Sequence, residues 1–144
     1  MTTTASTGHR PAPPLDAWAA QQVVLAFTAA LDRLDADEMI QHFAVSGVWR
    51  RPDGDVAGHD GIREFVANLA AGTVMRHVVT NTRVATLPDC RLQSESYFTV
   101  YIQRPGTVAP HLTPSAIGRY LDTLERRGPK WVIVERVVQF DLPD

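Results

Sequence analysis

The sequence predicts a single α+β domain in which N-terminal helices pack on one face of a strongly curved, mostly antiparallel sheet. Apolar residues with helical spacing and helix-capping signals are concentrated before Gly72. Four long segments rich in β-branched and aromatic residues follow between Val74 and Phe140, separated by turns. Helices followed by meandering strands are typical of a layered α+β domain, and a strongly bent sheet leaves a cone-shaped cavity under the helices.

Length and composition favour one domain and exclude some partners. A chain of 144 residues buries roughly two thirds of its unfolded surface. We expect a domain over residues 15–144, because residues 1–14 are rich in Thr, Ser, Gly and Pro and have little to bury, which predicts a disordered tail. A net charge of -2 argues against nucleic acid or an anionic membrane surface as a partner.

The location that we expect is cytoplasmic. Cys90 is the single cysteine, so the chain can form neither an internal disulfide nor a cysteine-based zinc site. The N-terminus lacks the basic flank and apolar core of a signal peptide. No apolar run approaches the roughly 18 residues that a membrane span requires.

The first predicted helix begins at Asp16 as N-cap and ends near an unusual carboxylate. Trp18, Leu25 and Asp32 recur at heptad spacing, so Asp32 lies on or beside the apolar stripe in the last turn. A carboxylate there meets the negative end of the helix dipole. Asp32 therefore needs a partner.

Two further helices and a hairpin follow. Asp35, with Glu38 three positions later, predicts the N-cap of a short second helix and a structural role for this aspartate. Residues 45–57 predict a hairpin whose turn is 51–54 and whose first strand carries Trp49. A third helix is predicted from about Asp60 to a stop at Gly72.

The long strand that begins at Met75 carries His77, the residue of greatest interest. Strand alternation places His77 on one face, and both faces are largely apolar. Two interpretations remain open: a core histidine bonded to backbone, or a base that points into a pocket. The predicted faces are Met75, His77, Val79, Asn81 and Ala85 on one side and Val74, Val78, Thr80 and Val84 on the other.

The remaining strands are predicted over 91–103, 116–126 and 131–140. Residues 104–114 hold three prolines and a glycine, which indicates an extended loop that could form a lid. In the last strand Arg136 interrupts an aliphatic face, where a charge has to be paired or exposed to a pocket. The alternative is an outer face on which Arg136 pairs with a neighbouring carboxylate such as Asp122. The aliphatic neighbours on the predicted face are Val132, Val134, Val138 and Phe140.

No metal or phosphate motif is visible. The five histidines lack metal-ligand spacing, and the chain has neither a phosphate-binding glycine loop nor a nucleophile elbow. We therefore expect no cofactor and no metal.

Several short runs together resemble the SnoaL-like group of the nuclear transport factor 2-like superfamily, which includes scytalone dehydratase and the lindane dehydrochlorinase. The resemblance covers Leu15 to Asp141. The order and spacing of the short runs are distinctive together, although each run is a weak signal by itself. The runs are 30–35, 48–49, Gly58, 76–81, 118–120 and 131–136.

The resemblance implies a catalytic pair. In those two enzymes an aspartate ending the first helix pairs with a histidine on the long strand and abstracts a proton without metal or cofactor; these positions fall on Asp32 and His77. An arginine five residues after a tryptophan assists departure of the anion in the dehydrochlorinase, and that spacing is met at Arg136.

The resemblance also implies a binding cavity. Its tryptophan and tyrosine fall on Trp49 and Tyr120, and Met75 and Val79 are expected to wall it beside His77. Scytalone dehydratase has a cavity histidine on the next strand, and near that position this sequence has Glu95 instead. Glu95 is therefore a candidate substrate-binding residue. Because of this difference, the resemblance does not imply the substrate of scytalone dehydratase.

The chemistry of these residues is consistent with elimination or isomerisation. A neutral imidazole is a usable base near pH 7, a carboxylate orients it, and a guanidinium favours a developing anion. We expect a lyase or isomerase of dehydratase, dehydrohalogenase or enolising type that acts on a small apolar, polyketide-like or steroid-like molecule. The alternative is a non-catalytic ligand-binding or assembly module, because fold alone does not determine function.

Apolar residues on both faces of the strands also predict self-association. Relatives bury the second sheet face against another copy, so we expect a homo-oligomer. A dimer is favoured over a trimer because two-fold closure is the commonest symmetry.

Overall fold

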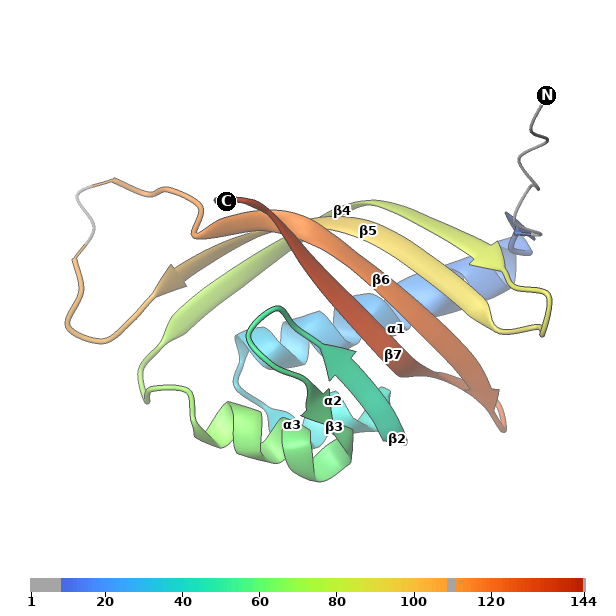
Figure 1. The fold of residues 1–144 in the computed structure, drawn as a ribbon, viewed down its shortest axis with the longest axis horizontal. Helices are drawn as coiled ribbons and strands as arrows, with labels where there is room; N and C mark the ends of the chain where they lie inside the picture. The colour runs from blue at the N-terminus through green and yellow to red at the C-terminus, as the bar shows by residue number, and fades with distance from the viewer. Residues whose placement is uncertain (1–8, 109–110, 144) are drawn as a thin grey trace.

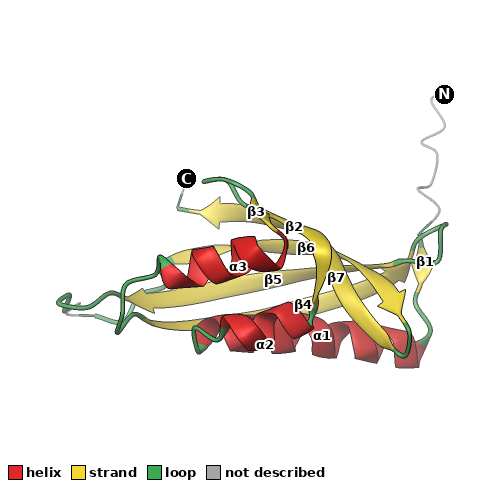
Figure 2. Cartoon of the chain, turned by 90° about the horizontal axis from the view of Figure 1, so that it is seen from below, coloured by secondary structure: helices red, strands yellow, loops and turns green. Residues whose placement is uncertain are grey.

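The computed structural model describes residues 9–108 and 111–143, which form three helices on one side of a curved sheet (Figures 1 and 2). Within these residues the sheet has seven strands in the order β1-β4-β5-β6-β7-β2-β3, and every neighbouring pair is antiparallel except β2 with β7. The predicted α+β architecture is confirmed. The elements are β1 (Arg10–Pro11), α1 (Pro14–Asp32), α2 (Ala36–Gln41), β2 (Phe43–Arg50), β3 (Val56–Ala57), α3 (Gly58–Ala67), β4 (Val74–Thr86), β5 (Leu92–Gln103), β6 (Ala116–Arg127) and β7 (Lys130–Leu142).

Helix α1 begins at Pro14, two residues before the predicted cap. Proline suits the first helical position because its fixed φ and missing N–H cost nothing there, and Asp16 lies in the first turn. The buried face runs through Ala20, Val24, Phe27 and Leu31. The predicted stripe through Trp18 and Leu25 is therefore wrong, since these side chains are 62% and 36% exposed.

The end of α1 leads tightly into α2. Leu34 has a φ of 56°, which turns the chain so that the Asp35 N–H donates to Ala30 O at 2.9 Å. The Glu38 N–H donates to Asp35 Oδ1 at 3.0 Å, so Asp35 caps α2 as predicted. This turn places the last residue of α1, Asp32, against the sheet.

A bulge in β4 changes which residues face the helices. Val79 of β4 pairs with Phe98 of β5, and Arg83 pairs with Glu95, so β4 has one more residue than β5 between these two pairs. Asn81 lies in this interval and has a φ of 55°. An extra residue reverses the alternation, so Val84 lies on the inner face opposite buried Ser94. The prediction that Asn81 and Ala85 continue the His77 face, with Val84 opposite, is wrong for this reason.

A second irregularity lies between β6 and β7. Thr123 pairs with Glu135 and Leu124 with Ile133, which leaves Val134 as an extra residue. Ile133 and Arg136 consequently both face the core and are fully buried. The predicted aliphatic face of Val132, Val134 and Arg136 is not a continuous stripe.

The N-terminal segment differs in part from the predicted tail. Arg10 and Pro11 form β1, which pairs with Thr86 and Ala85 of β4, so these residues are not an unstructured tail. Residues 1–8 of that predicted tail lie outside the described residues. None of the helices in the described part of the chain is long and apolar enough to cross a membrane.

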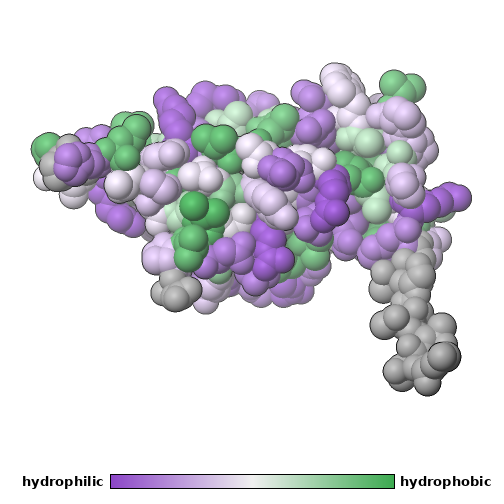
Figure 3. Space-filling model, turned by 90° about the horizontal axis from the view of Figure 1, so that it is seen from above, coloured by the Kyte–Doolittle hydropathy of each residue, from purple (hydrophilic) through white to green (hydrophobic). Residues whose placement is uncertain are grey.

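The outer face of the sheet carries apolar side chains between charged ones (Figure 3). Val74, Val78 and Tyr97 are each about half exposed there. Ion pairs of Arg83 with Glu95 and of Arg119 with Asp141 also lie on this face.

Candidate active site

A cavity of about 450 Å³ lies on the inner face of the sheet, within the size range of small-molecule sites. Its walls come from α1, β2, α3 and all four long strands, so it occupies the space under the curved part of the sheet. The lining is dominated by apolar and aromatic side chains, with His77 among them. The principal wall residues are Leu31, Trp49, Phe65, Met75, Phe98, Val100, Tyr120 and Val138.

Asp32 and His77 contact each other beside this cavity. The carboxylate Oδ1 lies 2.6 Å from His77 Nδ1, and Oδ2 accepts the His77 backbone N–H at 3.0 Å. The two side chains are only 13% and 8% exposed. Because an ionised carboxylate only accepts hydrogen bonds, Nδ1 carries the proton and Nε2 is left as the unprotonated nitrogen of the neutral ring.

The fold explains why this carboxylate is held so firmly. Asp32 is the last residue of α1, where the helix dipole disfavours a negative charge. His77 on β4 compensates for this, because its backbone N–H and its ring Nδ1–H each donate to one of the two carboxylate oxygens of Asp32. The pair therefore joins the end of α1 to the sheet and fixes the orientation of the imidazole.

Trp49 and Met75 line the cavity as predicted, whereas the prediction that Val79 also lines it is wrong. Val79 is half-buried and packs against the core. Trp49 is 1% exposed, contacts Phe27 edge-on at 5.7 Å between ring centroids, and lies 4.9 Å from the Phe65 ring. Its indole N–H has no acceptor among the described residues.

Tyr120 forms the floor of the cavity next to the histidine. Its ring stacks on Phe98 at 4.4 Å and lies 6.5 Å from the His77 ring. Burial is the main cause that raises the pKa of its hydroxyl well above the usual range. Tyr120 therefore keeps its proton and can donate a hydrogen bond at any ordinary pH.

Arg136 lies behind Tyr120 rather than in the cavity. It is fully buried, and its Nε and Nη2 donate to Asp122 Oδ1 and Oδ2 at 2.6 and 3.0 Å. Burial by itself would lower the pKa of this guanidinium, but the charge and hydrogen bonds of Asp122 outweigh it and raise the pKa. The guanidinium carbon is 4.1 Å from the centre of the Tyr120 ring and 4.9 Å from that of Phe27.

The predicted role of Arg136 in the cavity needs correction. The alternative pairing with Asp122 is the one found, although it lies on the inner face of the sheet and not on the outer face. A guanidinium already satisfied by a bidentate carboxylate can act on the cavity only through Tyr120.

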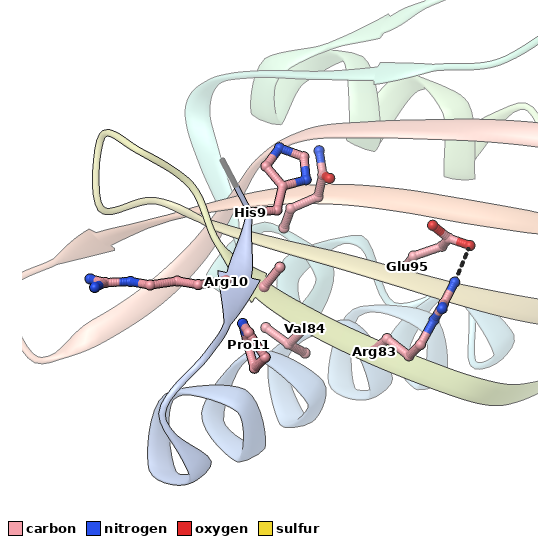
Figure 4. A pocket seen from close by; sticks show the side chains of 8 residues that line it. His9, Arg10, Pro11, Arg83, Val84 and Glu95 are labelled. Atoms are coloured by element: carbon pink, nitrogen blue, oxygen red, sulfur yellow. Dashed lines mark hydrogen bonds and ion pairs between the residues drawn. The ribbon is translucent and has the colours of Figure 1, made fainter. Parts of the chain in front are cut away.

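Glu95 is not part of the cavity. Strand alternation turns Glu95 to the outer face, while its neighbours Ser94 and Ser96 point inward and are fully buried. Glu95 accepts a hydrogen bond from Arg83 at 3.2 Å, in a shallow groove beside β1 (Figure 4). The prediction of a substrate-binding Glu95 is wrong for this reason.

Arg51 lines the cavity and was not predicted to do so. The sequence predicts a turn at Arg51, and the turn is present, since the Gly54 N–H donates to Arg51 O at 3.1 Å. Extending the alternation of β2 by one step from Trp49 would have placed Arg51 on the cavity side. Within 9–108 and 111–143, no three His, Cys, Asp or Glu side chains converge in a way that could hold a metal ion.

Residues 15–137 match the family model of the SnoaL-like domain. The chain belongs to the SnoaL-like family. This family lies within the nuclear transport factor 2-like superfamily, as the sequence resemblance implied. No curated protein matches the chain.

Solved structures share the fold at low sequence identity. Aln2 from a Streptomyces species is 18% identical with a TM-score of 0.78, covering 92% of this chain and 95% of Aln2. A Catenulispora acidiphila protein solved in complex with S-DNPA is 23% identical with a TM-score of 0.74, covering 90% and 96% of the two chains. A candidate scytalone dehydratase from Novosphingobium aromaticivorans is 16% identical with a TM-score of 0.73, covering 89% and 85%.

Proposed function

We propose that this SnoaL-like protein is a cofactor-independent lyase or isomerase that removes a proton from a carbon atom of a small, largely apolar molecule, with His77 as the base. The observation that carries the proposal is the contact between Asp32 and His77 beside the cavity. It orients the ring and leaves Nε2 available to accept a proton.

In the proposed reaction His77 Nε2 takes the proton, and Asp32 stabilises the imidazolium that forms. The electron pair left on carbon either expels a leaving group on the neighbouring carbon or is delocalised into a carbonyl as an enolate. In the first case the products are an alkene and either water, which forms when the departing hydroxide takes the proton back from the imidazolium, or halide, after which His77 releases the proton to solvent. In the second case the proton returns to a different carbon, and the substrate is isomerised.

Tyr120 is proposed as the group that stabilises the developing negative charge. Its protonated hydroxyl donates a hydrogen bond to the oxygen or halide on which charge accumulates. Arg136 is proposed as a positioning residue, because its guanidinium lies against the Tyr120 ring and its own charge is balanced by Asp122.

The aromatic lining supports a planar or polycyclic substrate of polyketide or steroid type. Phe98, Tyr120 and Trp49 present ring surfaces to the cavity, and its volume of about 450 Å³ is within the range of sites that hold molecules with several fused rings. Two proteins of the same fold are consistent with a small-molecule ligand: one was solved in complex with S-DNPA, and the other is described as a candidate scytalone dehydratase.

A non-catalytic ligand-binding module would use the same apolar cavity without needing the base. The ring opening of 5-nitrobenzisoxazole separates the two functions, because it requires removal of one C–H proton and releases a coloured phenolate. The wild type is expected to accelerate this reaction with saturation kinetics. His77→Gln is expected to reduce the rate to that of buffer, and Asp32→Asn is expected to lower it strongly.

His42→Gln is the matched control for loss of a histidine. His42 pairs with Glu38 on α2, outside the cavity, so its replacement is expected to leave the rate unchanged. A wild type that binds the compound but does not open its ring faster than buffer would favour the binding module. A His77→Gln variant as active as the wild type would remove His77 from the mechanism.

A further inference from the structure

Arg51 is held at the wall of the cavity by two aromatic rings. Its guanidinium carbon lies 5.0 Å from the centre of the Trp49 ring and 4.8 Å from that of Phe65. The side chain is only 18% exposed although it extends from a surface turn. Contact with two ring faces restricts the guanidinium to one position without neutralising its charge.

The hydrogen bonds of Arg51 leave one side of the guanidinium open. Nε and Nη2 donate to Asp53 Oδ1 and Oδ2 at 3.0 and 3.2 Å. A guanidinium has five N–H donors, and a second pair of them on Nη1 and Nη2 can bind another carboxylate. No acceptor for Nη1 is present among the described residues.

The charges at the wall of the cavity that carries Arg51 favour an anion. Arg51 and Arg104 are the two cationic side chains of its lining in the described residues, and Asp53 is the one carboxylate of that lining. Asp53 is 67% exposed, so it remains hydrated and cancels the field of Arg51 only in part. Arg104 has no acidic partner in the described part of the chain, which leaves an excess of positive charge at this wall.

We propose that Arg51 is an anion-recognition residue and that the substrate of this cavity is an organic anion, an aromatic or polycyclic carboxylate. The inference rests on the proposed function for the reaction, and it specifies the substrate class. The apolar rings of the substrate occupy the aromatic part of the cavity. Its carboxylate binds the open edge of Arg51, with Arg104 adding long-range attraction.

The pairing with Asp53 is consistent with this role. Residues 51 and 53 belong to one turn, so their ion pair contributes little to the fold, but it fixes the rotation of the guanidinium before a ligand arrives. The hydrogen bond from Arg51 lowers the pKa of Asp53, which keeps this orienting carboxylate ionised.

The test compares 2-naphthoate with 2-naphthamide, which have the same ring system and nearly the same shape but differ in charge. Dissociation constants are measured by isothermal titration calorimetry. The wild type is expected to bind the carboxylate at least about tenfold more tightly, which corresponds to about 1.4 kcal/mol. Arg51→Met keeps the aliphatic stem against the rings and is expected to abolish this preference.

Arg63→Met is the matched control because it removes the same charge from outside the cavity. Arg63 lies on α3 near Asp60 and Asp37, and its replacement is expected to keep the preference for the carboxylate. Equal binding of the two compounds by the wild type, or a preference that survives in Arg51→Met, would overturn the proposal.

Binding to His77→Gln separates this inference from the proposed reaction. The preference for naphthoate is expected to persist in this variant, because Arg51 and not the imidazole recognises the charge. Loss of the preference in His77→Gln together with its survival in Arg51→Met would show that the histidine holds the anion. Failure of the ring-opening assay would leave the binding comparison valid.

Discussion

Replacing Asp122 by asparagine is expected to lower the free energy of unfolding by about 3–5 kcal/mol, the typical cost of breaking a buried ion pair. Both Asp122 and Arg136 are 0% exposed, and two charge-assisted hydrogen bonds of 2.6 and 3.0 Å join them. A guanidinium cannot lose its proton at any accessible pH, so its charge would remain buried. Its other contacts are Thr28 at 3.4 Å and two aromatic faces, which carry no formal negative charge.

Urea unfolding followed by circular dichroism measures this cost, provided that the slope of the unfolding free energy against urea concentration is the same in the variant and the wild type. The double variant Asp122→Leu with Arg136→Met removes both charges and is expected to recover most of the lost stability.

Asp141→Asn is the matched control for the buried pair. Asp141 of β7 accepts two hydrogen bonds of 3.1 Å from Arg119 of β6, the same two strands, but the side chains are 39% and 42% exposed. Its effect is expected to be far smaller because water screens the pair. An Asp122→Asn variant no less stable than Asp141→Asn would refute the reasoning.

Three further predictions concern the floor of the cavity and the outer sheet face. Gly118→Ala is expected to destabilise the fold by about 1–3 kcal/mol in thermal or urea unfolding, because the new Cβ would overlap Gln139 O and lie 2.8 Å from the Phe98 ring; an unchanged midpoint would contradict this. Tyr120→Phe is expected to slow the ring opening of 5-nitrobenzisoxazole by about 10²-fold with little loss of stability, because it removes one donor to the developing anion; an unchanged rate would exclude the hydroxyl from the mechanism. The protein is expected to sediment as a homo-oligomer, with a dimer favoured, and Val78→Glu on the exposed sheet face is expected to dissociate it; a monomeric wild type at micromolar concentration would show that this face needs no partner.

The helices and the longer strands could be predicted from the sequence because their signals are local, whereas the short strand β1 was not predicted. Helical spacing, the cap at Asp35 and the turn before Gly54 depend on neighbouring residues, and each is present in the structure. The juxtaposition of Asp32 and His77 came from family resemblance combined with the anomalous position of Asp32. A residue that conflicts with its local environment often marks a site where tertiary contacts compensate.

The errors arose where one residue changes the face of a strand. Extra residues near Asn81 in β4 and Val134 in β7 reverse the alternation, and neither has a distinctive local sequence. Arg136 was correctly identified as anomalous, and Asp122 was named as an alternative partner. The choice between that pair and the cavity depends on the register of β6 against β7, which places the two residues directly opposite each other. Arg51 was missed because a residue next to a turn signal was not considered as part of the strand before it.

The tautomer of His77 tests the central claim most directly. Nitrogen-15 NMR of protein labelled at histidine, with His77→Gln used to assign the signal, distinguishes which ring nitrogen carries the proton when the ring is neutral. The structure predicts a protonated Nδ1 bonded to Asp32 and an unprotonated Nε2, and it predicts that Asp32→Asn weakens this preference. A neutral His77 protonated at Nε2 would have no lone pair there to accept a proton from a substrate, and would contradict the account.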